Sequence, residues 1–439
     1  MVWEIDREPH LPAMLSGDGE LRLDLNLTSI QGHAFMATLP ILVLNSGSSS
    51  IKFSIYEAGA TERTKLLEGA VDGIGAGAGM GKFWVKDAGG KKLVDQTPDL
   101  PDAAVAFALV VGALHQDEFP HPAAIGHRMV CGGPTVTENQ RITPELIDEM
   151  ELYTAFAPLH TPIAVFIMRQ ALALFPGVPN FVCLDSYFHR NLPEVTRHLP
   201  IPPKYAEMGV RRFGAHGLSY ESIVDALQPN VPERLIVAHL GNGASISAIR
   251  DGGGVETSMG LTPTGGIISG TRTGDIDPGV LIFILRDLLK AGVSGTEAAD
   301  ELEKVASKKA GLLGVSQLTN DMRGLREAIG EGNAKARLAV DEFVYVIRKF
   351  IGAYIAVLGG LDMLVFTGGI GENDAASRAE ICAGLECFGI HLDAARNGKR
   401  GETLISAAGS SDRSGVAVRV IPPAEDLMIV NHVCRLLEA

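Results

Sequence analysis

Basic residues are scarce relative to acidic ones in this chain of 439 residues. It has 38 Lys and Arg against 52 Asp and Glu, a formal net charge of −14 at pH 7. This balance argues against a nucleic-acid partner or an anionic-membrane surface, because both attract proteins through clustered Lys and Arg. An anionic substrate must therefore be bound by local arginines inside an otherwise acidic protein.

Cysteine is also rare, and long apolar runs are missing. The five cysteines are scattered and show no CxxC spacing, which favours reduced thiols and a cytoplasmic location over a disulfide framework or a zinc site. The first residues, MVWEIDREPHLPAML, lack the basic start and apolar run of a secretory signal, which argues against export. Residues 343–358 come closest to a membrane span, but Arg348 and Lys349 interrupt them, as in a buried helix with one polar edge.

A small-residue hairpin stands near the start of the chain, at residues 41–57 (ILVLNSGSSSIKFSIYE). Its backbone N–H groups and hydroxyls would gather at the tip, a shape suited to phosphate oxygens. It is no Walker A loop, because no Gly-Lys-Ser/Thr follows and the next element is a strand. Small residues at such a turn are more often only a turn, so the hairpin alone does not establish a site.

The same layout returns at residues 235–252 (LIVAHLGNGASISAIRDG). The alignment of the two hairpins matches Val43 with Val237, Gly47 with Gly241 and Ile55 with Ile249. One hairpin used twice predicts two related domains that face each other across a cleft.

Several polar residues stand where strands and helices begin or end. A short strand leads Arg128 to a Gly-Gly turn, and a strand over 180–184 carries Asp185 at its carboxyl end, where ligands of open α/β sheets commonly bind. His160 precedes a helix whose amino end favours anions, and His216 lies between small residues in FGAHG. Structural roles, an ion pair for Arg128 and packing for His160, remain open at this stage.

The densest stretch is ETSMGLTPTGGIISGTRTGDIDPGV, residues 256–280. So many small residues cost conformational entropy, which is easiest to explain at a functional site, and Arg272 is its one arginine. Further on, a strand over 363–367 leads into GGIGEN at 368–373, where a Gly-rich turn before a helix is a layout that cradles phosphates. That motif is weak evidence by itself.

Caps, periodicity and the positions of Gly and Pro predict the remaining elements. They place helices over 103–114, 144–156, 162–175, 280–289, 296–310 and 335–358, and a strand over 416–421 before a helix that opens at Glu425. Thr143 and Thr161 are the expected caps of two of these helices. Residues 1–39 lack periodicity, and we expect a poorly ordered extension or a product of a start codon upstream of Met36.

Taken together, LNSGSSSIKFSI, GHRMVCGG, APLHTP, FGAHG, AHLGNGASIS, TSMGLTPTGGIISGTRTGDIDPG, FTGGIGEN and VIPPAEDL resemble the acetate kinase family. The resemblance covers nearly all of residues 41–439. It implies an α/β fold of two duplicated actin-like (ribonuclease H-like) domains flanking a nucleotide cleft. The expected domains are 40–184 with 427–439, and 185–426, the latter binding the nucleotide.

The resemblance also implies an activity and a set of site residues. The reaction is the reversible, Mg²⁺-dependent transfer of a phosphoryl group from ATP to acetate, giving acetyl phosphate and ADP, in a homodimer. The implied catalytic residues are Asp185, His216, Arg272 and Arg128. The implied acyl site is formed by Arg128, Val130, Leu159, His160, Ala215 and Pro263. The implied nucleotide contacts are Lys52, His239, Leu240, Gly241, Asn242, Gly243, Asp321, Met322, Arg323, Gly369, Ile370, Gly371, Glu372 and Asn373. Magnesium, or manganese, would lie at Asn45 and Glu425.

The chemistry agrees with these roles. Acetate is already deprotonated at neutral pH, so we expect Asp185 to orient Arg128, metal or water and not to abstract a proton. The barrier comes from bringing two anions together, which arginines, a histidine donor and Mg²⁺ can offset.

The chain departs from the family pattern at the acyl site. The family usually has Tyr-Gly-Phe-His-Gly where this chain has residues 213–217, so Ala215 replaces an aromatic that packs on the acetate methyl. An enlarged pocket would favour a propionate or butyrate kinase, because one methylene is worth only about 1 to 3 kcal/mol. A third alternative is a catalytically silent nucleotide-binding or filament-forming relative. The joint presence of the implied catalytic residues argues against it. Thr161, Glu256 and Pro423-Ala424 depart from the usual Asn, Asp and Thr-Asn without removing a catalytic charge.

Overall fold

The computed structural model describes residues 38–47, 49–75, 81–115, 119–407 and 415–438. The expected extension over residues 1–39 lies outside these residues except at its end, where strand β1 begins at Leu39. Residues Thr38–Ala439 form one compact unit. All the geometry below belongs to this unit.

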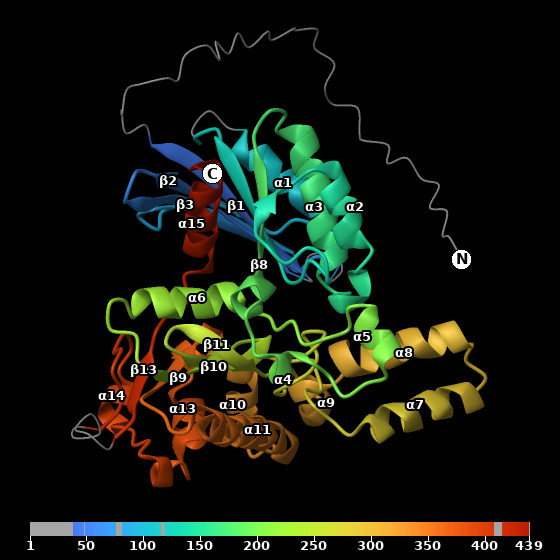
Figure 1. Ribbon diagram of the computed structural model, residues 1–439, viewed down its shortest axis with the longest axis vertical. Coiled ribbons are helices and arrows are strands. Elements are labelled where there is room, and N and C mark those ends of the chain that lie inside the picture. Colours follow the sequence, from blue (N-terminus) through green and yellow to red (C-terminus); the bar gives the residue numbers. More distant parts are fainter. Residues whose placement is uncertain (1–37, 48, 76–80, 116–118, 408–414, 439) are drawn as a thin grey trace, which may run out of the picture. The chain divides into compact units, whose positions relative to one another are not determined.

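The first sheet has the order β5-β4-β3-β2-β1-β6-β8-β7. Its strands are β1 (Leu39–Ser46), β2 (Ser50–Ala58), β3 (Arg63–Asp72), β4 (Lys82–Asp87), β5 (Lys92–Gln96), β6 (Ala124–Met129), β7 (Gln140–Arg141) and β8 (Asn180–Leu184). Helices α1 (Ala103–Leu114), α2 (Pro144–Glu151), α3 (Thr161–Leu174) and α15 (Glu425–Glu438) accompany it (Figure 1). Alternate residues of β1 explain this layering, because Leu42 and Leu44 pack with α1 and α3, whereas Ile41 and Val43 pack with α15.

The second sheet has the order β11-β10-β9-β12-β13. Its strands are β9 (Arg234–Leu240), β10 (Ala244–Arg250), β11 (Gly253–Thr257), β12 (Met363–Thr367) and β13 (Ala417–Val420). Helix α11 (Ala334–Leu358) packs on the face with Ile236 and Ala238, and α6 (Gly217–Ala226) on the face with Leu235 and Val237. Other helices of this region are α7 (Pro278–Lys290), α8 (Gly295–Lys308), α9 (Gly311–Ser316), α10 (Met322–Gly330), α12 (Gly368–Asn373), α13 (Ala375–Cys382) and α14 (Ala394–Gly398).

Short helices connect the two sheets. They are the 3₁₀ helix η2 (Asp185–His189), α4 (Glu194–Arg197) and α5 (Pro203–Glu207). Two further 3₁₀ turns are η1 (Thr154–Phe156) and η3 (Glu386–Phe388). No helix among the described residues is long and apolar enough to cross a membrane.

The duplication expected from the two hairpins is present in the topology. The inner strands β3-β2-β1-β6-β8 have the same order and the same parallel and antiparallel pairings as β11-β10-β9-β12-β13. The second hairpin turn is one residue shorter, since the last paired positions are Ser46 with Ile51 and Leu240 with Ala244. Consequently Ile55 corresponds to Ala248, and its predicted match with Ile249 was wrong.

Most predicted elements are confirmed, and the differences have local causes. Helix α1 and strands β8 and β12 have the predicted bounds. Helix α2 ends at Glu151, and the predicted remainder is the separate 3₁₀ turn η1. Thr161 is the first residue of α3 and not its cap, a position that His160 holds without a side-chain hydrogen bond. The GGIGEN motif forms helix α12 and not a turn.

Candidate active site

A buried ion pair joins the carboxyl ends of two parallel strands, β6 and β8. Nη2 of Arg128 lies 2.6 Å from Oδ2 of Asp185, and Nε lies 3.3 Å from Oδ1. The Asp185 side chain is fully buried. Burial raises the pKa of Asp185, and the Arg128 charge opposes this rise. Two parallel hydrogen bonds fix the plane of the guanidinium group, so Asp185 orients Arg128.

Arg128 also links β1 to the start of α15. Its Nη1 donates to Oδ1 of Asn45 (3.0 Å), whose Nδ2 donates to Oε2 of Glu425 (3.4 Å). Burial raises the pKa of Glu425, but the charges of Arg128, His239 and Lys52 together bring it below the ordinary value. Glu425 is therefore an anion in this cluster. Lys52 is exposed on β2, opposite Asn45 in the hairpin register.

His216 is held at the amino end of α6 in the left-handed backbone region, with φ of 54°. The following Gly217 is required there, because a Cβ would overlap with the carbonyl oxygen of Asp185. Nδ1 of His216 lies 2.8 Å from Oγ of Ser245, which also contacts the Tyr220 hydroxyl. Burial, and then nearby positive groups, lower the pKa of His216 well below its usual value, so the ring is neutral.

The two histidines of the site stack on each other beside the second hairpin turn. The rings of His216 and His239 have centroids 4.2 Å apart and an interplanar angle of 21°, and Oγ of Ser219 lies 2.8 Å from Nδ1 of His239. A Cβ on Gly243 would be 3.4 Å from both Nε2 of His216 and Nη1 of Arg272. The small turn residue thus lets both groups approach the backbone closely.

Arg272 is a partly buried charge without a counter-charge. Its Nη1 donates to the carbonyl of Pro263 (3.2 Å), and no carboxylate of the described chain forms an ion pair with it. Burial, followed by the Arg128 charge, lowers the pKa of Arg272 to about 10. A desolvated guanidinium of this kind is stabilised by a bound anion.

Arg272 borders a small cavity of about 240 Å³ between the start of α3 and the loop at residues 262–264. Of the predicted acyl-site residues, it is lined by Leu159, His160 and Pro263. Nδ1 of His160 is buried without a hydrogen-bond partner, and burial with the Arg272 charge lowers the pKa of His160 to about 3. The cavity therefore offers apolar side chains beside a cation, and its other lining residues include the Glu303 carboxylate and the hydroxyls of Thr262 and Thr264.

The other three predicted acyl-site residues, Arg128, Val130 and Ala215, do not line this cavity. Val130 and Ala215 belong to an apolar cluster that includes Phe156, Phe213 and Met259. Both are almost fully buried.

A larger pocket of about 980 Å³ opens beside the second sheet. The predicted nucleotide residues that line it are Gly241, Asn242, Asp321, Met322, Arg323, Gly369, Ile370 and Asn373. The other predicted nucleotide residues lie elsewhere. His239 stacks on His216, and Gly243 approaches Arg272. Lys52 lies on β2, Leu240 and Gly371 are buried, and Glu372 lines a different cavity. The structure therefore brings most, but not all, of the predicted nucleotide residues to one pocket.

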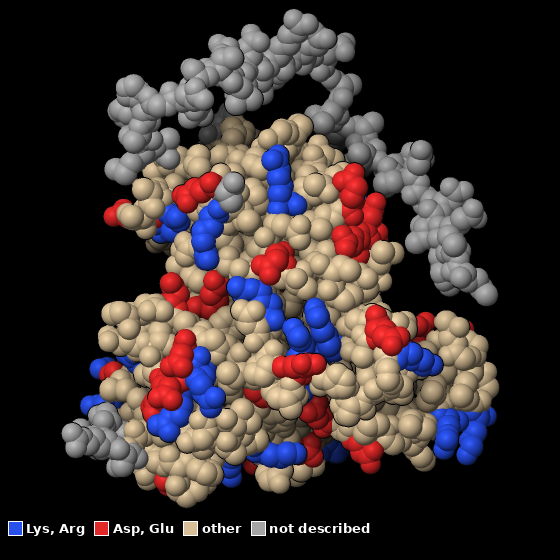
Figure 2. All heavy atoms as spheres, in the orientation of Figure 1, with Lys and Arg blue, Asp and Glu red and all other residues tan. Residues whose placement is uncertain are grey.

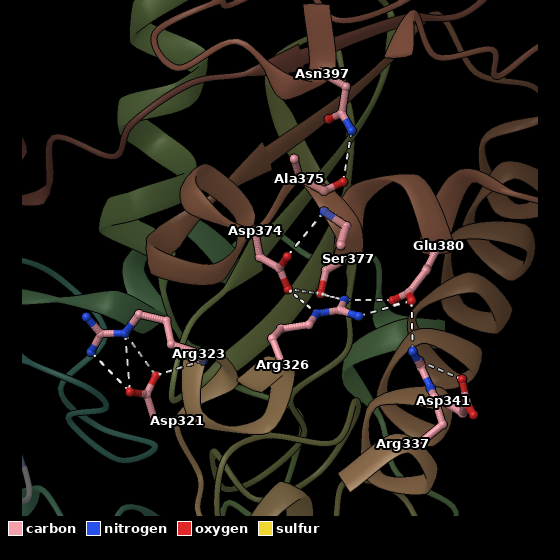
Figure 3. Close-up of polar contacts among 11 residues, drawn as sticks. Asp321, Arg323, Arg326, Arg337, Asp341, Asp374, Ala375, Ser377, Glu380 and Asn397 are labelled. Carbon is pink, nitrogen blue, oxygen red and sulfur yellow. Dashed lines mark hydrogen bonds and ion pairs between the residues drawn. The ribbon is translucent and has the colours of Figure 1, made fainter. Parts of the chain in front are cut away.

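The sequence prediction missed part of this pocket's wall. Figure 3 shows Arg326 between two acids: its Nε donates to Asp374 (3.0 Å), and its Nη2 to Glu380 (2.7 Å) and Ser377 (2.9 Å). Arg337 bonds to the same Glu380 (3.0 Å). The residues missed are Asn320, Arg326, Glu327 and Asp374. Two signals could have found some of them: Arg326 follows Met322 by one helical turn, and Asp374 directly follows GGIGEN.

Known proteins resemble this chain over most of its length. The model of the acetokinase family matches residues 40–431. This chain belongs to the acetokinase family. It is 38% identical over 412 residues to an acetate kinase of Phocaeicola vulgatus, covering 91% of this chain and 100% of that protein.

Two solved structures extend the family likeness to the fold. An acetate kinase of Porphyromonas gingivalis has a TM-score of 0.76 at 35% identity, covering 91% of this chain and 100% of that one. A propionate kinase of Francisella tularensis has a TM-score of 0.79 at 33% identity, covering 90% and 98%. The α/β class with two duplicated actin-like halves is confirmed. Acetokinases use ATP, and generally Mg²⁺, to phosphorylate a carboxylate.

Proposed function

We propose that this acetokinase catalyses the reversible transfer of a phosphoryl group from ATP to acetate, giving acetyl phosphate and ADP. The proposal rests mainly on Arg272, a partly buried guanidinium without a counter-charge. It borders the small cavity on one side and the turn at Gly243 on the other. An acetate in the cavity and a γ-phosphoryl group at the turn would both meet this charge.

The remaining side chains can lower the barrier without a general base. Acetate is ionised at neutral pH, so Asp185 acts by fixing Arg128, which with Arg272 offsets the repulsion between two anions. A chain of hydroxyls from Tyr220 through Ser245 can direct a proton toward Nδ1 of His216. Nε2–H of the neutral ring is then free to donate to an equatorial phosphoryl oxygen in an in-line transfer.

We place Mg²⁺ at Glu425 and Asn45. The depressed pKa of Glu425 makes it an anion, and it lies within 3.4 Å of the Asn45 amide. Mg²⁺ is usually held by one or two carboxylates together with substrate phosphates, so the Glu425 carboxylate fits such an ion. Oδ1 of Asn45 would join it by giving up its hydrogen bond from Arg128. When bound, Mg²⁺ supplies charge neutralisation to the phosphates. We propose that the residues lining the larger pocket bind the rest of the nucleotide.

A propionate or butyrate preference is the second candidate. Ala215 favours it, since an aromatic is the usual residue of the family there, and a similar structure is that of a propionate kinase. The apolar cluster around Ala215 opposes it, because Phe156, Phe213 and Met259 pack near the position where other family members have an aromatic ring. Acetate is therefore the first choice of substrate.

Assembly and compartment belong to the same proposal. We propose a cytoplasmic homodimer in which residues 40–184 with 427–439 and residues 185–426 form the two domains. Helix α7 supports a self-association surface, because it has no buried residue in the single chain. Scattered cysteines, all free in the structure, are typical of a reducing compartment.

Acyl phosphate formation tests the function directly. Purified protein with ATP, Mg²⁺ and acetate should give acetyl phosphate, trapped with hydroxylamine as the hydroxamate. Arg272→Ala should lower turnover by about 10³-fold or more, because such an arginine is worth about 10³ to 10⁵ in rate. The exposed Arg141→Ala is the matched control and should keep wild-type turnover.

Two results would contradict this proposal. If a folded Arg272→Ala protein, checked by circular dichroism, keeps more than about a tenth of wild-type turnover, the role of Arg272 is wrong. If wild-type protein binds ADP but forms no hydroxamate with any short-chain acid, the chain is a silent relative.

A further inference from the structure

A third cavity, of about 290 Å³, lies outside the residues assigned to catalysis and nucleotide binding. We call it the arginine pocket, lined by Pro134, Thr137, Glu138, Ser186, His189, Arg190, Asn191, Arg197, Arg211, Arg212 and Phe213. Figure 2 shows basic side chains gathered in the centre of the visible face, in the region where Figure 1 places α4. A concentration of positive charge is unusual in a protein with a net charge of −14.

Two of the four arginines have acidic partners. Nε of Arg190 lies 3.8 Å from Glu138, and Nε of Arg212 lies 3.5 Å from Glu256. Arg212 also donates to backbone carbonyl groups. Structural ion pairing therefore explains these two side chains.

Arg197 and Arg211 have no such explanation. Neither forms an ion pair with a carboxylate of the described chain, and Nε of Arg211 is buried without an acceptor. The Arg211 guanidinium lies 4.8 Å above the Phe213 ring. Burial, and next the charge of Arg197, lowers the pKa of Arg211. Two neighbouring guanidinium groups without a counter-charge repel each other, and a bound anion would relieve that repulsion.

The walls of the arginine pocket share backbone with the catalytic cluster. Arg211 and Phe213 lead along the chain to His216, and Ser186 directly follows Asp185. His189 connects the two segments, since its Nε2 donates to the carbonyl of Ala215 (3.1 Å). An anion in the pocket would therefore act on the segment that positions His216.

We propose that the arginine pocket binds a small dianion through Arg197 and Arg211, and that its binding steadies the segment from Phe213 to His216. The shared chemistry is a pair of negative charges on a compact oxyanion, in the form of a phosphate group or a dicarboxylate. Its two charges match the two unpaired guanidinium groups. The effect on turnover rests on the proposed function, whereas the binding itself does not.

Titration calorimetry with the whole protein tests the binding. Saturating ADP, Mg²⁺ and acetate fill the catalytic cleft except for the γ-phosphoryl position, so the Arg197 and Arg211 variants decide whether added anion binds in the arginine pocket. Inorganic phosphate and malonate are the two probes, and we expect at least one of them to bind. Arg211→Ala and Arg197→Ala should each weaken that binding by about tenfold or more, because the loss of a hydrogen bond to a charged group lowers affinity by about this factor. Arg141→Ala should leave it unchanged.

The two probes identify the chemistry. Binding of phosphate alone assigns the pocket to phosphate groups, binding of malonate alone assigns it to dicarboxylates, and binding of both supports a general dianion site. In hydroxamate assays the bound probe should change kcat or KM in wild type, but not in Arg211→Ala. The proposal is overturned if neither probe binds the ADP-filled protein. It is also overturned if both variants bind as tightly as wild type. Circular dichroism and ADP affinity show that the variants are folded, and these binding results stand even if no acyl phosphate forms.

Discussion

Ala215 is the position of the predicted acyl site at which this chain departs from the family, although it does not line the small cavity beside Arg272. It is 2% exposed, and its methyl group lies in the cluster with Val130, Phe213 and Met259. If space remains there, longer acids should compete, because a methylene changes kcat/KM by only about 10- to 200-fold. We expect wild-type kcat/KM for propionate within about a hundredfold of that for acetate.

The variant Ala215→Phe tests the same residue from the opposite direction. The added ring should reduce kcat/KM for butyrate more than for acetate, by about tenfold. Because a ring can overpack a filled cluster, Ala215→Val serves as the smaller step, with the same direction expected. Parallel kinetics on acetate, propionate and butyrate measure the outcome. An acetate preference well above a hundredfold in wild type would remove the relaxed pocket.

At the residue scale, motifs predicted the catalytic cluster better than the pocket walls. Arg128, Asp185 and His216 each stand in a short run of small or apolar residues, and the fold brings them together. Arg326 was missed because its partners Asp374 and Glu380 lie 48 and 54 residues further along the chain. Its place one helical turn after Met322 could have suggested that Arg326 lines the pocket, but the local sequence does not indicate ion pairs over such a separation.

At the scale of elements, hydrophobic pattern and caps were sufficient for most helices and strands. The duplicated hairpins could be predicted because both have apolar strands around a turn of small residues. Their relative register could not, since Gly and Ser align equally well with either turn length. Likewise, the glycines of GGIGEN predicted a turn, yet this segment forms helix α12. Arg378, which lies in α13, stabilises that helix because it donates to the carbonyls of Gly371 and Glu372. A tertiary contact here overrides the local propensity.

Helix α7 gives a prediction at the element scale. It contacts mainly α8 and exposes Val280, Ile282, Phe283 and Leu289, with Phe283 72% exposed (Figure 1). Such an apolar face on a helix is costly in water, and a second copy of the chain would cover it. Phe283→Glu should therefore convert a dimer into a monomer in light scattering after size exclusion.

Leu152→Glu is the matched control for this surface. Leu152 is an apolar side chain that is 79% exposed at the C-cap of α2, so its replacement should leave assembly unchanged. A wild-type protein that is monomeric at micromolar concentration, or a Phe283→Glu protein that remains dimeric, would exclude α7 as the interface.

The protein contains histidines that are neutral because they are buried, and its stability should depend on pH for that reason. His127 and His189 are each 2% exposed, and burial lowers the pKa of both to about 4. In the unfolded chain they titrate near pH 6.5, so below that pH the unfolded state binds more protons than the folded state. Stability is therefore complete above pH 6.5 and falls as the pH drops toward 4. At pH 5 each histidine should cost about 2 kcal/mol.

Asp426 acts in the opposite direction, because burial raises its pKa and the folded state takes up its proton first. We expect the histidines to dominate as the pH falls from 7.5 to 5, because both are mostly protonated in the unfolded chain at pH 5, whereas Asp426 opposes them with a single proton. A cost of about 4 kcal/mol is a large part of the 5 to 15 kcal/mol typical of a folded protein. Thermal unfolding should therefore shift down by several degrees. His127→Gln can keep a bond to Asn180 Oδ1 without titrating, so its midpoint should fall less between the two pH values. Equal falls for variant and wild type would show that His127 is not a source of the acid sensitivity.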